Sequence, residues 1–344
     1  MIRGGKMIKW LEDSGVEDDV VISSRIRIAR NLENFKFPQI MNREEAEDIS
    51  LKILNVAKKS DSFNDYKFYR VNDLSVLEKN VFIEEHLISP NLVQNQEKGS
   101  FLLKNDESVT IMINEEDHLR IQCLSSGLNL EELWSAANNI DDILEESLDF
   151  AFDEKFGYLT SCPTNTGTGM RASVMIHLPS LVFTGYMNNI YQALSQIGLT
   201  VRGLYGEGTS ALGNIFQISN QTTLGETEEE IIQKLKNVII QIADKEREVR
   251  NKLLNTRQIE IEDKVFRSMG ILKYSRILSS NEAMSLLSDV KMGIEMGIIK
   301  NIEPKEINKL MILIQPASLQ KYFETDLTAE KRDIKRAELI REKI

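Results

Sequence analysis

Residues 18–31, which read DDVVISSRIRIARN, decide the fold of this chain. Apolar side chains recur at alternate positions of this stretch, and polar side chains occupy the positions between them. Successive side chains of a β-strand point to opposite faces, so the alternation predicts a strand with one buried face and one polar face. We expect the apolar face to carry Val20, Ile22, Ile26 and Ile28, and the polar face to carry Ser23, Arg25 and Arg27.

The same alternation recurs in three later segments, residues 108–124, 160–179 and 198–208. Each segment again sets an arginine against the apolar face, and these arginines are Arg120, Arg171 and Arg202. Two amphipathic helical patterns, capped by Asn129 and Thr227, supply apolar stripes that need a sheet to cover. We therefore expect one sheet with an apolar face under helices and an arginine-rich face open to solvent.

The five arginines predict a phosphate-binding face. A single arginine on the wet side of a strand is ordinary, but five on one face of a chain with net charge −11 repel one another unless an anion lies among them. A nucleoside triphosphate, with about four negative charges, suits guanidinium groups that bind in bidentate fashion. The chain has no GxxxxGK[ST] loop and no HRD or DFG motif, so neither a P-loop nor a eukaryotic-type protein kinase site is expected.

Carboxylates border the predicted arginine face. Glu115, Glu116 and Asp117 follow one strand pattern, and Glu207 lies five residues after Arg202. Such acidic runs are often solvated turns, but beside a phosphate site they are suited to hold a cationic acceptor such as a guanidinium or ammonium group. The two cysteines also differ in context. Cys162 precedes a turn and is either a small buried side chain or part of the site, whereas Cys123 alternates with Ile121 and is expected in the core.

The pattern of the chain changes near residue 255. Its 344 residues, at roughly 150 per domain, predict about two domains. We expect a domain of residues 1–255 with strands and helices, followed by an all-α domain of residues 256–344. Helices of the second domain should begin after Ser280, at Pro304 and after Thr328. The predicted fold class is α+β, an antiparallel sheet flanked by helices and followed by a helical region.

Composition and termini predict a cytoplasmic chain. Two cysteines are too few for a disulfide framework, and three histidines without an HExxH motif give no support for a metal site. The N-terminus turns acidic before a signal peptide could form, and no apolar run approaches the roughly 18 residues of a membrane span. The negative net charge argues against direct binding of nucleic acid or an anionic membrane.

Four runs carry a family resemblance: VISSRIRIAR (21–30), INEEDHLRI (113–121), SCPTNTGTGMRASV (161–174), and RGLYGEG (202–208) with IFQISNQTTLG (215–225). In this order they closely resemble the ATP:guanidino phosphotransferases, which include creatine and arginine kinases. The resemblance implies the guanidino kinase catalytic fold, with ATP as phosphoryl donor and Mg²⁺ held mainly through the nucleotide. Glu116 matches the catalytic carboxylate, Glu207 the second carboxylate that holds the acceptor, and Cys162 the thiolate beside the reactive nitrogen.

The resemblance also implies a nucleotide site. The positions that it assigns to ATP binding are Ser23, Ser24, Arg25, Ile26, Arg27, His86, Arg120, Arg171, Ala172, Ser173, Val174, Met175, Arg202, Gly203, Leu204, Tyr205 and Gly206.

Within the family, the chain is more similar to the bacterial kinases that phosphorylate arginine side chains of proteins. Only about 22 residues precede the SSRIR strand, whereas metabolite kinases carry a long helical domain there, and this predicts an open acceptor site. The late motif RDIKRA (332–337) matches a regulatory phosphoarginine pocket, with Arg332, Asp333, Arg336 and Ala337 as its residues. The same charges, spaced three or four residues apart, also fit a solvated helix face.

The same resemblance implies a set of partners. They are protein substrates with exposed arginines, a zinc-finger activator protein, a heat-shock repressor, a Clp unfoldase–protease that degrades the marked proteins, and a second copy of the chain in a homodimer. Two other functions remain open on the sequence: a small-metabolite arginine kinase, and a non-catalytic adaptor that binds phosphoarginine. The eight matching site residues favour an active kinase over the adaptor.

Overall fold

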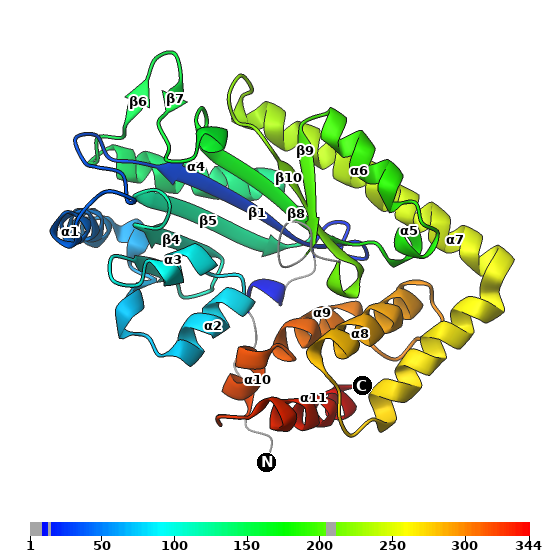
Figure 1. Cartoon of the computed structure of the whole chain (residues 1–344). Coiled ribbons are helices and arrows are strands. Elements are labelled where there is room, and N and C mark those ends of the chain that lie inside the picture. The colour runs from blue at the N-terminus through cyan, green and yellow to red at the C-terminus, as the bar shows by residue number, and fades with distance from the viewer. Residues whose placement is uncertain (1–8, 13–14, 204–210) are drawn as a thin grey trace.

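The central feature is one sheet of eight strands, seen from its arginine-bearing side in Figure 1. The computed structural model describes residues 9–12, 15–203 and 211–344. All neighbouring strands pair antiparallel, which confirms the expected fold class. In their order across the sheet, the strands are β2 (Tyr66–Arg70), β3 (Ser100–Lys104), β4 (Val109–Ile113), β5 (Leu119–Ser126), β1 (Val21–Arg30), β8 (Met170–His177), β10 (Ile215–Asn220) and β9 (Leu199–Gly203).

Helices lie on both sides of this sheet, and a short hairpin of β6 (Phe152–Asp153) and β7 (Gly157–Tyr158) projects beyond its end (Figure 1). The helices are α1 (Arg43–Lys59), α2 (Val76–Glu84), α3 (Pro90–Gln94), α4 (Leu130–Glu145), α5 (Pro179–Phe183), α6 (Met187–Gln196), α7 (Glu228–Tyr274), α8 (Ser280–Glu295), α9 (Pro304–Leu313), α10 (Pro316–Tyr322) and α11 (Ala329–Lys343). None of the helices among the described residues is long and apolar enough to cross a bilayer.

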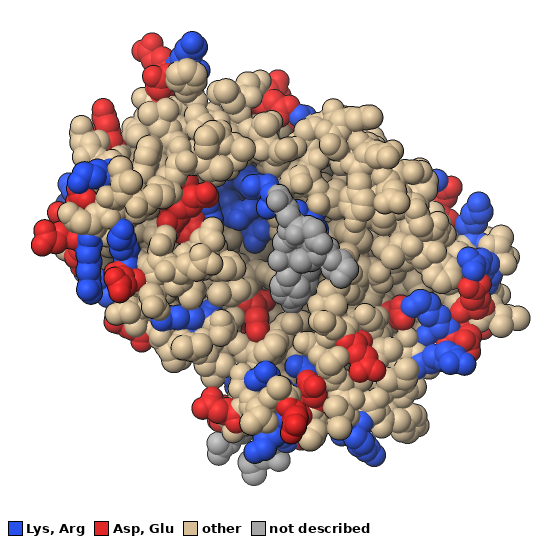
Figure 2. Space-filling model, viewed as in Figure 1, with Lys and Arg blue, Asp and Glu red and all other residues tan. Residues whose placement is uncertain are grey.

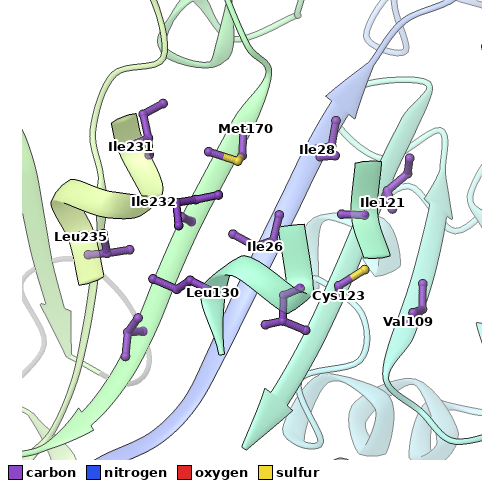
Figure 3. Packing of buried hydrophobic residues seen from close by; sticks show 14 of the residues in the cluster. Ile26, Ile28, Val109, Ile121, Cys123, Leu130, Met170, Ile231, Ile232 and Leu235 are labelled. Atoms are coloured by element: carbon purple, nitrogen blue, oxygen red, sulfur yellow. The ribbon is translucent and has the colours of Figure 1, made fainter. Parts of the chain in front are cut away.

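The first hydrophobic core lies between the sheet and α1, α4, α6 and the first part of α7. Figure 3 shows apolar side chains of three central strands pointing toward α4 and α7. The alternation in the sequence predicts this face correctly. The core contains Ile26, Ile28, Ile121, Cys123, Ala172 and Val174, as expected.

The register of β1 differs from the expected one at its start. Ile22 belongs to the second core, on the opposite side of the sheet from Ile26. The pairing of β1 with β8 shifts between Val21 and Ser23, where a bulge interrupts the ladder. One extra residue in a strand reverses the side to which the preceding side chains point. The prediction that side chains alternate strictly between the two faces is therefore wrong at Ile22 and correct from Ser23 onward.

The arginine-bearing face of the sheet is only partly open, contrary to the expectation from sequence. A second hydrophobic core lies on this side of the sheet, between the strands and α2, α3 and the helices after residue 257. It includes Phe101, Leu124 and Ile215. His177 at the end of β8 is fully buried, with Nε2 2.8 Å from Ser288 Oγ of α8. The C-terminal helices therefore cover one end of this face and leave its middle accessible.

Helix α7 runs from the sheet into the C-terminal helices and bends at Arg257, where φ is −139° and ψ is 32°. Helices dominate after this bend, as expected, although the division of the chain into domains at residue 255 stays a prediction. Pro304 and Thr328 begin their helices as predicted, but Ser279, not Ser280, caps α8. Asn129 precedes α4 but makes no side-chain cap bond, and its Nδ2 donates to Ser126 O.

Candidate active site

Arginines from four strands lie on the sheet face opposite the first core. Arg25 and Arg27 on β1 alternate with core residues, and Arg120 on β5, Arg171 on β8 and Arg202 on β9 do the same. Antiparallel pairing places Arg27 directly opposite Arg171, with Gln122 on its other side. In Figure 2, Lys and Arg side chains gather in a hollow at the middle of this face, with Asp and Glu side chains at one edge.

The positive charges of this face act on one another. Burial, together with the charges of Arg120 and Arg171, lowers the pKa of Arg25 to about 10. Burial and the charges of three neighbouring arginines lower the pKa of Arg27 well below its usual value. Arg27 Nε is buried and has no hydrogen-bond partner within the described part of the chain. An anion among these groups would offset their repulsion and favour their charged forms.

Polar side chains hold two of the arginines in place. Arg25 donates to Gln217 Oε1 at 2.7 Å and to Ser173 Oγ at 3.4 Å, so β8 and β10 orient its guanidinium. Arg171 donates to Ser219 Oγ at 3.5 Å. Such contacts reduce the entropy that a flexible side chain would lose when it binds a ligand.

The predicted acidic cluster forms the turn between β4 and β5, beside the arginines. Arg120 donates to Glu115 Oε1 at 2.7 Å and to Glu116 Oε2 at 2.9 Å. Glu115 is buried and also accepts a hydrogen bond from Ser89. The side chain of Glu116 is 33% exposed, whereas Asp117 is fully buried. Within this turn, Glu116 is the carboxylate that a ligand on the arginine face can reach.

The loop that carries Cys162 is bonded to this turn. Ser161 N donates to Asp117 Oδ1 at 2.7 Å, which joins the residues next to Cys162 and Glu116. Cys162 is partly exposed, with Sγ 3.1 Å from Thr164 Oγ1, so it is not a core side chain. The structure thus brings the segments of Glu116 and Cys162 together. Cys123, by contrast, is buried in the first core as predicted.

His86 lies at the opposite side of the arginine cluster, directly after α2. Its backbone is left-handed, with φ 60°, and its ring meets Trp10 edge-on at 6.4 Å between centroids. Burial and the charge of Arg25 lower the pKa of His86 to about 4, so its ring is neutral at pH 7. His86 lines a small cavity together with Ser23, Arg25, Leu124, Ser173, Met175 and Gln217.

The other residues assigned to the nucleotide site divide between the two faces. Three of them, Ser23, Ser173 and Met175, line the cavity of His86. Ile26, Ala172 and Val174 point into the first core, and Ser24 Oγ donates to Gly127 O at 2.7 Å. The side chains of this second group therefore point away from the arginine face. Gly203 ends β9, whereas Leu204, Tyr205, Gly206 and Glu207 lie outside the described residues.

The four RDIKRA residues lie on α11, distant in sequence from this face and packed among the C-terminal helices. Arg336 is 1% exposed and donates to the main-chain oxygens of Ile314 and Leu278, each at 2.8 Å, and to Asp333. Ala337 is fully buried. Arg332 is partly buried and donates to Leu327 O at 2.9 Å. The solvated helix face considered from sequence is therefore wrong for Arg336 and Ala337.

Among the described residues, no group of three or more His, Cys, Asp and Glu side chains is arranged to hold a metal ion. A divalent ion that accompanies a nucleotide would be held mainly through the phosphate oxygens.

Two residues beside the site were missed from sequence, Asn31 and His118. Asn31 Nδ2 donates to Asp117 Oδ1 at 2.7 Å, and its Oδ1 accepts from His118 N at 2.9 Å. His118 Nδ1 accepts from Leu32 N, which leaves Nε2 as the donor to Lys36 O and defines a neutral ring. In the sequence, the only indication for Asn31 is that a polar residue directly follows the strand that carries Arg25 and Arg27. A polar residue at this place is equally typical of a turn.

Comparison with known proteins agrees with this geometry. The sequence model described as ATP:guanido phosphotransferase, C-terminal catalytic domain, matches residues 48–249. A second, described as protein-arginine kinase McsB C-terminal domain, matches residues 258–344. Among solved structures, a lombricine kinase superimposes with a TM-score of 0.60 at 24% identity over 68% of each chain, which supports the fold alone.

Relatives match over nearly the whole chain. A protein-arginine kinase of Geobacillus sp. (strain WCH70) is 52% identical over 97% of this chain and 93% of its own length. One from Clostridium tetani is 48% identical over 98% of this chain and 99% of its own length. The chain therefore belongs to the ATP:guanidino phosphotransferase family and is an enzyme of that family. Within it, these relatives at about half identity are protein-arginine kinases.

Proposed function

We propose that the chain transfers the γ-phosphoryl group of ATP to arginine side chains of proteins. The observation that carries this proposal is the opposition of Arg27 and Arg171 on a partly buried face, with Glu116 at its edge. A face of this kind suits a polyanion, and the adjacent carboxylate suits a cation. The names of the relatives support a protein as the acceptor.

In this proposal the arginines neutralise and orient the triphosphate. Arg25 and Arg27 from β1 act with Arg120, Arg171 and Arg202 from the neighbouring strands. His86, Ser23, Ser173 and Met175 form the adjoining cavity, which suits the less charged part of the nucleotide. Phosphoryl transfer passes through a loose transition state with charge on the equatorial oxygens, so positioned cations lower its free energy. Mg²⁺, held through the nucleotide, would supply further positive charge.

Glu116 aligns the acceptor and takes its proton late. The pKa of an arginine side chain is about 12.5–13.8 and that of a glutamate about 4.3, so proton transfer before reaction would cost roughly 11–13 kcal/mol. We assign to Glu116 charge-assisted hydrogen bonds to the acceptor guanidinium, followed by proton acceptance as the N–P bond forms. Glu207 would supply the second carboxylate and Cys162 a thiolate beside the reacting nitrogen, as in the family that the chain belongs to.

Family membership also supports a regulatory setting. In this proposal, phosphorylation marks proteins for degradation by a Clp unfoldase–protease during stress in the cytoplasm. A zinc-finger protein activates the enzyme, a heat-shock repressor is among the substrates, and the chain acts as a homodimer. Arg332, Asp333, Arg336 and Ala337 would bind phosphoarginine as an allosteric ligand.

The test is a phosphorylation assay with two acceptors. The full chain is incubated with ATP and Mg²⁺, and with either free arginine or an arginine-bearing protein, and phosphoramidates are identified by mass spectrometry under neutral conditions. We expect phosphoarginine on the protein. A product on free arginine alone would indicate a metabolite kinase, and binding of phosphoarginine without any product would indicate an adaptor.

A further inference from the structure

A buried hydrogen-bonded cluster ties the Glu116 turn to the Cys162 loop. Its centre is Asn31, the residue directly after β1, which is 1% exposed. The Nδ2 group of Asn31 donates to Asp117 Oδ1 at 2.7 Å and to Leu159 O at 3.0 Å. Its Oδ1 accepts from His118 N at 2.9 Å. One side chain thus bonds to Asp117 and His118 of the turn and to Leu159 at the start of the Cys162 loop.

Asp117 completes the cluster from the other direction. Its Oδ1 accepts both from Asn31 and from Ser161 N, at 2.7 Å each. Asp117 follows Glu116 in the chain, and Ser161 precedes Cys162. Loss of either of these two hydrogen bonds would therefore allow the Glu116 turn and the Cys162 loop to move relative to each other. Because Asp117 is fully buried, loss of a donor would leave its charge poorly compensated.

The main chain of Asn31 adds a third attachment. Ala151 N donates to Asn31 O at 2.8 Å, at the start of the segment that leads through the β6–β7 hairpin to Cys162. Farther along the same segment, Arg30 donates to Thr168 O at 2.9 Å. The end of β1 therefore holds the segment of Cys162 at its beginning and at its end, while the middle of β1 presents Arg25 and Arg27.

We infer that Asn31 is a positioning residue that sets the placement of Glu116 relative to Cys162. This inference rests on the roles proposed above for those two residues. The Nδ2 and Oδ1 atoms of Asn31 are bonded within the cluster, so no direct contact with a ligand is assigned to it. It acts by holding the acceptor-binding segments in register with the strands that bind phosphate. Errors of about 1 Å in such placement commonly cost on the order of 100-fold in rate.

Asn31→Ala provides the first test. We expect kcat to fall about 10- to 100-fold while KM for ATP stays within about twofold, because the strands that carry the arginines are unaffected. The rate of alkylation of Cys162 by iodoacetamide, followed by mass spectrometry, should change several-fold, with buried Cys123 as the internal reference. The control is Ser288→Ala, which removes buried hydrogen bonds to His177 and Asn214 far from this loop. It should leave the alkylation rate unchanged.

Asn31→Asp provides a second test, which remains informative even if Asn31→Ala folds poorly. The new carboxyl group would face Asp117. The titratable residues directly beside this pair in the chain are Arg30, Glu116 and His118. Two adjacent carboxylates favour sharing a proton, and a protonated Asp at this position can again donate to Asp117. The ratio of its kcat to that of the unmodified enzyme should rise as the pH is lowered from 8 to 6.

The outcomes separate this inference from the proposed function. Unchanged kcat and unchanged Cys162 reactivity in Asn31→Ala would overturn the positioning role, and so would a loss of ATP affinity equal to the loss of kcat. A flat ratio for Asn31→Asp across this pH range would also overturn it. The proposed function fails separately, if the unmodified enzyme forms no phosphoarginine on protein.

Discussion

Arg27 of β1 and Arg171 of β8 occupy directly opposed positions in an antiparallel ladder. Like charges at such positions are destabilising. Arg25 and Arg120 lie on the same face as this pair. Their positive charges lower the pKa of Arg27 further. The free enzyme therefore holds an unfavourable concentration of positive charge, which the proposed binding of a triphosphate would relieve.

Replacement of Arg27 should consequently have opposite effects on stability and binding. We expect Arg27→Met to raise the melting temperature of the nucleotide-free enzyme by about 2–4 °C, because repulsion at the pair with Arg171 is removed. The same change should weaken ATP binding about 10- to 150-fold, the loss of one charge-assisted interaction. Differential scanning fluorimetry with and without ATP measures both quantities.

The matched control for this prediction is Arg70→Met. Arg70 is exposed and pairs with Glu47 on α1, away from the arginine face, so its loss should leave ATP binding unchanged. A lower melting temperature for nucleotide-free Arg27→Met would contradict the proposed strain.

Glu116→Gln should reduce catalysis without loss of the fold. The amide keeps the size of the side chain but cannot accept a proton, so we expect kcat to fall about 100- to 1000-fold. The contact with Arg120 is partly exposed and its loss should change the free energy of unfolding little. Phosphoarginine formation and urea denaturation measure the two effects. Turnover close to that of the unmodified enzyme would remove Glu116 from the proposed mechanism.

Acid should destabilise the enzyme through its histidines. Burial lowers the pKa of His86 to about 4, and burial also lowers the pKa of His118 and of His177. The unfolded chain binds protons at these groups near pH 6.5, whereas the folded chain binds them only at lower pH. The free energy of unfolding should therefore fall as the pH drops below about 6.5, by up to roughly 1.4 kcal/mol per pH unit for each histidine.

Urea denaturation between pH 7.5 and 5 measures this slope. His177 is fully buried and bonded to Ser288, so His177→Gln keeps a polar partner while removing one titrating group. In this variant, the pH dependence of the free energy of unfolding should correspond to about one proton fewer taken up on unfolding. An unchanged slope would show that His177 is protonated alike in both states.

Arg336 and Arg332 should respond differently to substitution, although both belong to the RDIKRA motif. Arg336→Ala leaves the main-chain oxygens of Ile314 and Leu278 without their buried donor, so we expect a loss of about 3–5 kcal/mol in the free energy of unfolding. Arg332→Ala removes one partly buried bond to Leu327 O and should cost about 1 kcal/mol.

This difference decides how the proposed phosphoarginine pocket should be tested. Titration of phosphoarginine against Arg332→Ala is informative because the C-terminal helices remain folded. We expect the activation or change of assembly by phosphoarginine to disappear in this variant. A full response would exclude Arg332 from the pocket. Arg336→Ala alone could not distinguish a lost ligand contact from a lost helix.

Much of this site could be predicted from the sequence, because alternation in strands is a local property. The positions of Arg25, Arg120 and Arg171 follow from a period of two, and the core on the opposite face follows with them. Bulges are not visible in such a pattern, and Ile22 was therefore assigned to the wrong face. The burial of His177 depends on α8, which lies about a hundred residues later, and local periodicity contains no information on that contact.

The cluster around Asn31 could not be predicted for the same reason. Its partners are Asp117, Leu159 and His118, which approach only when β5 and the loop before β8 are both in place. Residue types alone indicate an ordinary polar turn at each of these positions. Glu116, the carboxylate proposed to be catalytic, was identifiable through resemblance to a family, whereas the residue that holds its turn required coordinates.

The central place of β1 has a consequence for synthesis of the chain. Arg25 emerges from the ribosome well before its ladder partners Leu124 and Ser173. Pairings between such distant residues form slowly, since a long loop must close first. If the arginine face binds nucleotide as proposed, we expect nascent chains to gain this capacity only after β8 and β10 have been translated. Truncated translation products should be inactive and should expose an unpaired, arginine-rich strand that invites capture by chaperones.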